Sequence, residues 1–178
     1  PNIILMTPSD ENETRLLLTT AYEYKGPAAV RYPRGTGPNS TVKFALEPLE
    51  IGKAKLVREG KSNIIFLNFG ALLDEAEIVS KEMDMTLIDM RFVKPLDEDM
   101  LHKYLNNADM FVSLEDGSIS GGAGSAVQEY CGRNNIIIKS LLFGIPDKFI
   151  DHASREEMLD QAGLSATKIL DKLKTLQE

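Results

Sequence analysis

The sequence is poor in the residues that form disulfides, zinc sites and histidine-based catalytic sites. It contains a single cysteine, Cys131, two histidines, His102 and His152, and no tryptophan. One cysteine cannot form a disulfide within the chain, and three such ligands leave little for a zinc site. A Ser-His-Asp triad would have to use one of the same two histidines. We therefore expect no metal site and no catalytic residue from this set.

Long apolar runs and positive charge are also scarce. No run approaches the length of a membrane span, and no segment has the pattern of a signal peptide. The 20 basic residues are outnumbered by 27 acidic ones, for a net charge of −7. An acidic surface repels phosphate backbones, although it leaves room for one small basic pocket for a phosphorylated metabolite. The composition predicts a cytoplasmic protein that binds neither nucleic acid nor membrane.

What is present is the ordinary mixture of a globular domain. The chain has 178 residues, of which 43% are hydrophobic and 26% are charged, enough for one domain or slightly more. It opens directly on an apolar strand, Ile3–Met6, with no initiator methionine. A strand in that position needs a sheet to join, so we expect the chain to be a fragment whose upstream part is missing.

Apolar runs alternate with amphipathic stretches along the chain. This alternation predicts a three-layer α/β/α sandwich with a mostly parallel sheet. One strand, Lys53–Arg58, is expected to run antiparallel in a hairpin with Asn63–Phe69, because the link between them is too short for a parallel crossover. The near-continuous apolar run Ile136–Leu142 predicts a strand covered on both faces. A turn-rich segment, Gly35–Ser40, marks the expected domain boundary.

Two arginines follow a short predicted strand, in the segment Arg31-Tyr32-Pro33-Arg34-Gly35. Ligands collect at the carboxyl ends of strands in doubly wound sheets, and two guanidiniums can bind a phosphate through paired hydrogen bonds. From spacing alone, an incidental pair of surface arginines is the more frequent explanation of such a pattern.

A second candidate is the stretch from Glu115 to Ser125, in which two carboxylates precede a glycine-rich loop and a helix. Helix amino termini bind anions, which favours a nucleotide-binding or regulatory module. The third glycine of a dinucleotide fingerprint is absent, however, and Glu115 and Asp116 would repel a pyrophosphate. Tight turning and close helix packing explain the glycines better. Whether Glu115, Asp116 or the Gly121–Ser125 loop binds anything stays open, as does an interaction module without catalytic function.

Five segments together resemble a known family. In chain order they are Thr7–Glu13 (TPSDENE), Ala29–Gly35 (AVRYPRG), Asp89–Asp97 (DMRFVKPLD), Gly121–Ser125 (GGAGS) and Gly144–Asp147 (GIPD). The ordered set resembles the carboxyl-terminal part of the 1-deoxy-D-xylulose-5-phosphate synthases, within the transketolase-like thiamine-diphosphate family. The resemblance covers essentially the whole chain.

The resemblance implies a layout and an activity. Residues 1–36 would be the last strand-helix-strand of a pyrimidine-binding domain, residues 37–50 a linker, and residues 51–178 a transketolase-type carboxyl-terminal domain. The family condenses pyruvate with D-glyceraldehyde 3-phosphate and releases carbon dioxide, for isoprenoid, thiamine and pyridoxal synthesis. It uses thiamine diphosphate and a divalent ion, usually Mg²⁺, and a homodimer is expected.

The resemblance also assigns residues. Arg34 matches the family's arginine that contacts the substrate phosphate, and Arg31 is a second, weaker substrate-binding candidate. The family's catalytic glutamate and its diphosphate and metal ligands precede the first matching segment. We therefore expect no catalytic, cofactor-binding or metal-binding residue here, and no activity from the chain alone.

Overall fold

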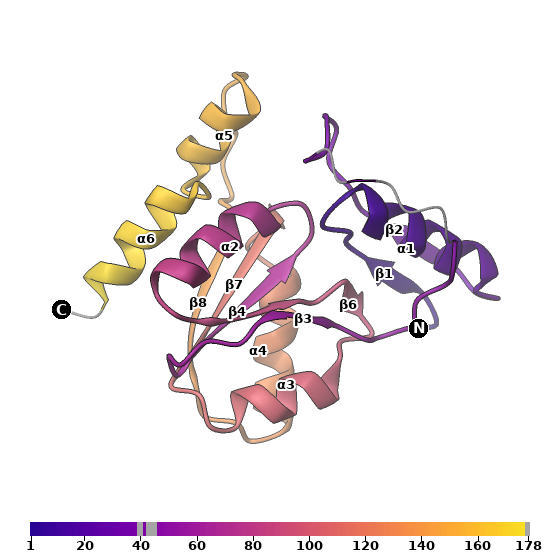
Figure 1. Cartoon of the computed structure of the whole chain (residues 1–178), viewed down its shortest axis with the longest axis horizontal. Helices are drawn as coiled ribbons and strands as arrows, with labels where there is room; N and C mark the ends of the chain where they lie inside the picture. The colour runs from indigo at the N-terminus through magenta and orange to yellow at the C-terminus, as the bar shows by residue number, and fades with distance from the viewer. Residues whose placement is uncertain (39–40, 42–45, 177–178) are drawn as a thin grey trace.

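A computed structural model describes residues 1–38, 41 and 46–176 (Figure 1). Its elements, in chain order, are β1 (Ile4–Met6), α1 (Glu11–Glu23), β2 (Ala28–Val30), β3 (Lys55–Arg58), β4 (Ile64–Phe69), α2 (Leu73–Glu82), β5 (Thr86–Asp89), β6 (Phe92–Lys94), α3 (Glu98–Leu105), β7 (Met110–Ser118), α4 (Ala123–Arg133), β8 (Lys139–Ile145), α5 (Arg155–Ala162) and α6 (Ala166–Thr175).

The larger part of the chain forms a five-stranded sheet in the order β3-β5-β4-β7-β8. Its strands are parallel except for β3, which runs antiparallel to β5. Neighbouring residues of β4 point to opposite faces, as the pleat requires. Phe66 packs with residues of α2 and α6, and Leu67 packs with residues of α3 and α4. Helices thus cover both faces, and the predicted three-layer sandwich with one antiparallel strand is confirmed.

The predicted hairpin between Lys53–Arg58 and Asn63–Phe69 is wrong. Strand β3 is antiparallel as expected, but its partner is β5 rather than β4. Arg58, the last residue of β3, stabilises this pairing, because its guanidinium donates to the carbonyl oxygens of Ser80 and Met85 at 2.8 Å. The chain then crosses the start of β5, where a Cβ at Gly60 would collide with the backbone of Asp84.

The predicted strand Ile136–Leu142 is displaced along the sequence. Strand β8 begins at Lys139, and it forms the edge of the sheet, where most of its residues are only half-buried. Ile136 and Ile138 pack against the core from the preceding loop, whereas Ile137 is fully exposed. The apolar run therefore mixes loop and strand. The expected coverage on both faces holds for the strand part, because Leu142 packs with the core on the α3 and α4 side and Leu141 packs with the core on the α2 and α6 side.

A second, three-stranded sheet has the order β2-β1-β6, with α1 packed on it. Strands β1 and β2 are parallel, and β6 comes from the other side of the predicted boundary to pair antiparallel with β1. Phe92 of β6 is fully buried against Ile4, Met6 and Leu17. The boundary at residue 36 stays a prediction. Within the predicted linker, residues 39–40 and 42–45 lie outside the described residues.

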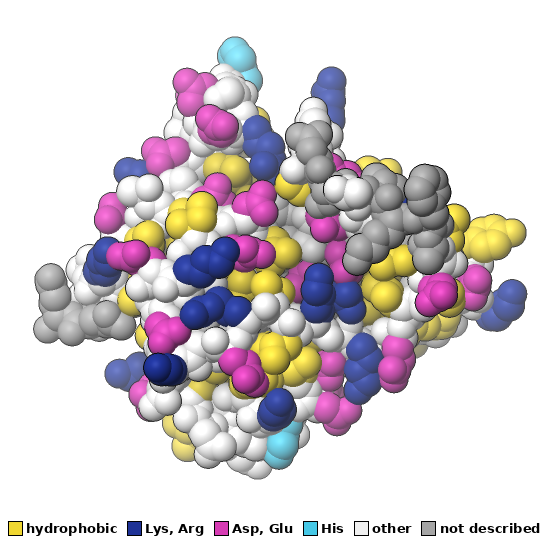
Figure 2. Space-filling model, in the orientation of Figure 1, with side chains coloured by type: hydrophobic (Ala, Val, Ile, Leu, Met, Phe, Trp, Pro, Cys, Tyr) yellow, Lys and Arg dark blue, Asp and Glu magenta, His cyan; other side chains and the backbone are white. Residues whose placement is uncertain are grey.

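Helices α5 and α6 extend from the body of the molecule (Figure 1). Ser154 and Glu157 have the three-residue spacing that predicts a capping box, and they form one at the start of α5. Helix α6 buries Ile169 and Leu173 against α2. No helix of the described residues is long and apolar enough to cross a bilayer. Outside the grey residues, the face in Figure 2 mixes acidic and basic side chains.

Candidate functional site

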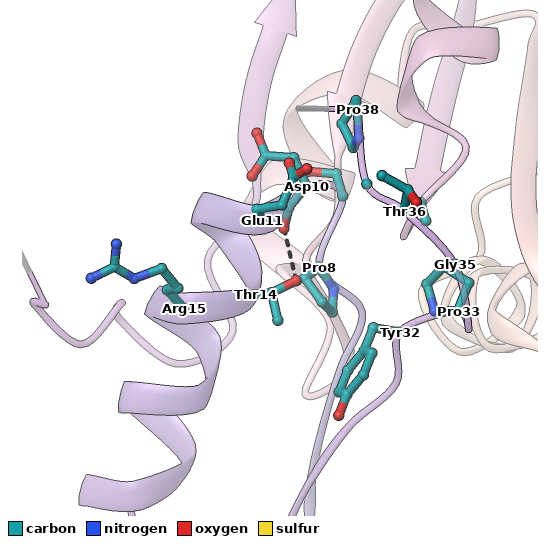
Figure 3. Close-up of a pocket in the computed structure, with 13 residues that line it drawn as sticks. Pro8, Asp10, Glu11, Thr14, Arg15, Tyr32, Pro33, Gly35, Thr36 and Pro38 are labelled. Atoms are coloured by element: carbon teal, nitrogen blue, oxygen red, sulfur yellow. Dashed lines mark hydrogen bonds between the residues drawn. The ribbon is translucent and has the colours of Figure 1, made fainter. Parts of the chain in front are cut away.

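The candidate site is a cavity of about 260 Å³ beside the start of α1, past the ends of β1 and β2. Three segments line it: the start of α1, the loop after β2, and Ala71 just before α2 (Figure 3). An adjoining cavity of about 240 Å³ shares Ser9, Pro33 and Gly35 and reaches Asp74 and Arg155. The motifs around residues 7–13 and 29–35, which are separate in the sequence, therefore form opposite walls of one site.

The start of α1 is held in place by its own cap. The Asp10 carboxylate accepts a 2.7 Å hydrogen bond from the Glu13 backbone N–H, and the Thr14 hydroxyl donates to the Asp10 carbonyl oxygen at 2.8 Å (Figure 3). The sequence also allows Thr7 to cap a helix whose first residue is Pro8. The structure shows this prediction to be wrong, because α1 begins at Glu11 and Asp10 is its N-cap. The positive end of the α1 dipole is directed toward the cavity wall formed by Ser9 to Glu11.

The structure separates the two predicted substrate-binding arginines. Pro33 and Gly35 line the cavity, while Arg34 between them is exposed and lies outside the lining of both cavities. Arg31 forms a 2.7 Å ion pair with Asp116, at the end of β7. Its guanidinium therefore binds a carboxylate of the chain itself. The substrate-binding roles of Arg34 and Arg31 stay predictions.

Beneath the cavity lies a buried polar network that sequence reasoning missed. Asp89 is fully buried, and its carboxylate accepts hydrogen bonds from the Ser9 hydroxyl at 2.7 Å and the Asn68 amide at 3.3 Å. Next to it, Arg91 pairs with Glu13 at 2.6 Å. Burial raises the pKa of Asp89 to about 6. In the sequence, Asp89 and Arg91 stand at the end of a predicted strand. That position can indicate a functional site, but charged residues there equally often form turns and helix caps.

The glycine-rich loop before α4 is occupied by the protein itself. The Glu115 side chain is buried, and its Oε1 accepts a 3.1 Å hydrogen bond from the Gly124 N–H in the first turn of α4. A Cβ at Gly122 would collide with the same oxygen. An anion bound at the amino terminus of α4 would need the position that Glu115 Oε1 occupies. The arrangement counts against the nucleotide-binding interpretation and supports close packing as the reason for the glycines.

Comparison with known proteins resolves the family. The family described as "Transketolase, C-terminal domain" matches residues 52–169, which is well over half of the chain. The chain belongs to this transketolase C-terminal domain family. The match covers the five-stranded sheet and helices α2 to α5 and ends within α6. The resemblance read from the five motifs is confirmed.

Similar proteins include 1-deoxy-D-xylulose-5-phosphate synthases. A 1-deoxy-D-xylulose-5-phosphate synthase of Pseudomonas syringae pv. syringae (strain B728a) is 49% identical over 166 residues, which are 93% of this chain and 26% of that protein. The enzyme of the same name from Stutzerimonas stutzeri (strain A1501) is 50% identical over 169 residues, 95% of this chain and 27% of that protein. The chain therefore spans about a quarter of the length of these relatives.

Solved structures agree on the fold. A split-gene transketolase, described as an inactive β4 tetramer, matches with a TM-score of 0.85 and 25% identity over 98% of this chain and 57% of that one. Transketolase from Campylobacter jejuni matches with a TM-score of 0.66 and 15% identity over 98% of this chain and 26% of that chain, which shows the fold alone.

Members of the wider transketolase family use thiamine diphosphate, and the α4 amino terminus does not fit the diphosphate of that group. Among the described residues, no cluster of three or more His, Cys, Asp or Glu side chains could hold a metal ion. The α4 amino terminus, which could have received a diphosphate, holds Glu115 instead. Cys131 is buried, and burial raises the pKa of its thiol, which disfavours a nucleophilic role.

Proposed function

We propose that this chain acts as the carboxyl-terminal part of a 1-deoxy-D-xylulose-5-phosphate synthase. The complete enzyme would condense pyruvate with D-glyceraldehyde 3-phosphate in the cytoplasm and release carbon dioxide. Thiamine diphosphate and Mg²⁺ would be held by residues outside this chain. The observation that carries the proposal is the identity of about 49% to synthases across more than nine-tenths of the chain.

Within that enzyme, the chain would brace the catalytic domains and contribute Arg34 to substrate binding. Arg34 stands on the loop that forms one wall of the cavity, where an exposed guanidinium can reach a phosphate presented from outside. Asp10 and Glu11 lie on the facing wall. The carboxylates of Asp10 and Glu11 repel an anionic substrate. The positive charge of Arg34 would therefore have to supply the attraction that binds it.

The surface of the small sheet supports docking against further protein. Strand β2 is an edge strand, and Ile3, Leu18, Tyr22 and Tyr32 of the same region are exposed large hydrophobic residues. Such residues near an open strand edge are typical of a contact surface. We infer that the remaining part of the enzyme covers this surface and that the complete enzyme forms a homodimer. The inactive β4 tetramer of the split-gene transketolase supports an assembled but inactive state for this chain alone.

A chimera tests the assignment. This chain would replace the matching carboxyl-terminal quarter of the P. syringae synthase, and deoxyxylulose phosphate formation would be assayed with thiamine diphosphate and Mg²⁺. We expect turnover by the chimera and none by the 178-residue chain. Activity of the isolated chain, or a folded chimera without activity, would contradict the proposal.

Arg34→Ala in the active chimera tests the site. Loss of a charge-assisted hydrogen bond should raise the KM for D-glyceraldehyde 3-phosphate by roughly ten- to a hundredfold and leave the KM for pyruvate nearly unchanged. Arg133→Ala is the matched control, because Arg133 is an exposed arginine at the end of α4, and its ion pair with Glu98 is long, at 3.4 Å. Equal behaviour of the two variants would leave the family assignment intact and refute the role of Arg34.

A further inference from the structure

Ser9 connects the cavities to the interior of the protein. It lines both cavities, yet it is only 5% exposed, and its hydroxyl donates to Asp89 Oδ2 at 2.7 Å. A serine hydroxyl has a single hydrogen. While that hydrogen is bound to Asp89, it is not available to a ligand in the cavity.

The other oxygen of Asp89 is already occupied. Asn68 Nδ2 donates to Asp89 Oδ1 at 3.3 Å and to the Gly70 carbonyl oxygen at 2.9 Å. An amide nitrogen can only donate, so a proton on Oδ1 would face another donor. A proton taken up by Asp89 is therefore best placed on Oδ2, between the carboxyl group and Ser9 Oγ.

We propose that Asp89 is a positioning residue whose protonation state sets the direction of the Ser9 hydroxyl at the cavity wall. In the ionised form, Asp89 accepts the hydrogen of Ser9. In the protonated form, Asp89 Oδ2–H donates to Ser9 Oγ, and the Ser9 hydrogen turns away from Asp89. Ser9 can then donate to an anionic oxygen in the cavity. The proton comes from solvent, and no bond between heavy atoms forms or breaks.

Burial and the charges around Asp89 place its change of protonation near pH 6. Burial raises the pKa of Asp89 to about 6, and the negative charge of Glu13 on α1 acts in the same direction. Arg91 and the hydrogen bonds from Ser9 and Asn68 oppose it. The groups that face this region from the packed elements are Glu13, Arg91, Lys55 of β3, which lies 4.0 Å from Glu13, and the pair of Asp116 with Arg31 beyond Gly70.

Arg91 does not cancel the raised pKa of Asp89, because its guanidinium is bound to Glu13. Arg91 pairs with Glu13, and the Asp89 carboxylate is left with two neutral donors. Two buried carboxylates thus lie near one buried guanidinium that pairs with only Glu13, a balance that favours a proton on Asp89. This inference stands apart from the proposed synthase activity, since its consequences are measured at Ser9 and Asp89 themselves.

The experiment is an NMR titration of the 178-residue chain between pH 4.5 and 8, with ¹³C-labelled aspartate carboxyl groups and ¹⁵N-labelled amides. We expect one midpoint near 6 at Asp89 and the same midpoint in the Ser9 amide shift. Ser9→Ala removes a hydrogen bond to the ionised form and should raise the Asp89 midpoint by roughly one pH unit. Ser9→Thr, which keeps the hydroxyl, should restore it.

Two further variants separate positioning from a merely structural role. Asp89→Asn should abolish the titration of the Ser9 amide near pH 6, whereas Asp99→Asn, at an exposed carboxylate on α3, should leave it unchanged. An Asp89 midpoint that does not move in Ser9→Ala, or a Ser9 titration that survives in Asp89→Asn, would overturn the proposal. If Asp89→Asn does not fold, the Ser9→Ala and Ser9→Thr midpoints decide it, because Asp89 is intact in both.

Discussion

At the scale of single residues, the contact between the two sheets depends on a buried ion pair. Glu13 and Arg91 approach to 2.6 Å, and both side chains are largely buried. Glu13 Oε2 and Arg91 Nε have no hydrogen-bond partner within the part of the chain that the structure describes. The pair is therefore not optimal, but each partner neutralises a charge that would otherwise be buried alone.

Glu13→Ala is expected to destabilise the protein by about 3 kcal/mol, because it leaves the Arg91 guanidinium buried without a counter-charge. Urea unfolding would measure this loss. The double variant Glu13→Ala/Arg91→Ala should be less destabilised than the sum of the two single variants. Glu77→Ala is the control: it breaks an exposed pair with Lys81 on α2 and should cost well under about 1 kcal/mol. Strict additivity at Glu13 and Arg91 would contradict the coupling.

Asp89 predicts a dependence of stability on pH. Its pKa is about 6 in the folded protein and near 4 when unfolded. Its protonated form is therefore favoured by folding, and the resulting stabilisation is fully present below about pH 4 and lost as the pH rises through 6. The free energy of unfolding of the parent, relative to Asp89→Asn, should fall by up to about 3 kcal/mol between pH 4 and 7. A constant difference across that range would refute the raised pKa.

The residue-level predictions succeed where the interaction is local. Asp97 follows a predicted strand and precedes an amphipathic stretch, a place that favours an aspartate helix cap. Its carboxylate does cap α3, where it accepts a 3.0 Å hydrogen bond from the Met100 N–H. The partnership of Asp89 with Ser9 joins residues 80 positions apart. No local pattern specifies such a contact, because it depends on how two sheets meet.

At the scale of elements, helix α4 shows two different uses of glycine. Gly124 lies in the first turn, where an added Cβ would collide with Ser113 Oγ and lie 3.0 Å from Leu142 Cδ2. Gly132 lies in the last turn, and an added Cβ there would meet no atom within 4 Å. The first glycine permits close packing of the helix on the sheet, whereas the second has no such role.

The two positions therefore predict opposite outcomes for the same substitution. Gly124→Ala should destabilise the protein by roughly 1–3 kcal/mol, because the methyl group has no space between α4 and the sheet. Gly132→Ala should stabilise it by up to about 1 kcal/mol through the lower conformational entropy of the unfolded chain. Thermal unfolding of the two variants beside the parent provides the measurement. Similar effects at both sites would show that α4 does not pack as closely as described.

Element positions followed from periodicity, but pairing did not. The spacing of Ser154 and Glu157 predicts their capping box, and the spacing of Ile169 and Leu173 predicts the buried face of α6, whereas Leu176 at the same spacing is exposed. The run from Ile136 to Leu142 satisfied the rule for a buried strand, yet only its second half belongs to β8. Its first half packs as a loop, since hydrophobic side chains can fill a core from any backbone conformation.

At the scale of the whole molecule, the two sheets are joined by more than the linker. Strand β6 pairs with β1, Arg31 binds Asp116, and the Thr7 N–H donates to the Arg91 carbonyl oxygen at 2.7 Å. Asp116 belongs to β7 of the five-stranded sheet, and Arg91 and β6 directly follow its strand β5, so these contacts hold residues 1–31 against that sheet. The small sheet is therefore built from both sides of the predicted boundary.

This connection predicts cooperative unfolding. Amide hydrogen exchange should give β1 and β4 similar free energies of opening in the parent protein. Arg31→Ala should lower the free energy of opening at β1 more than at β4, because it removes one link and leaves the core of the five-stranded sheet intact. Rapid exchange at β1 in the parent would instead show that the small sheet opens independently. Ile78→Ala, at an exposed position on α2, is a control that should affect neither strand.

The sequence by itself determined the class of fold, the caps of α3 and α5 and, through its ordered motifs, the family. Each of these rests on interactions between residues close in the chain or on the alternation of apolar and polar side chains. Only the tertiary structure decided that β3 pairs with β5, that β6 joins the small sheet, that Arg31 is bound to Asp116, and that Glu115 fills the α4 amino terminus. These contacts depend on which surfaces meet after the elements pack, and many buried polar groups find their partners only then.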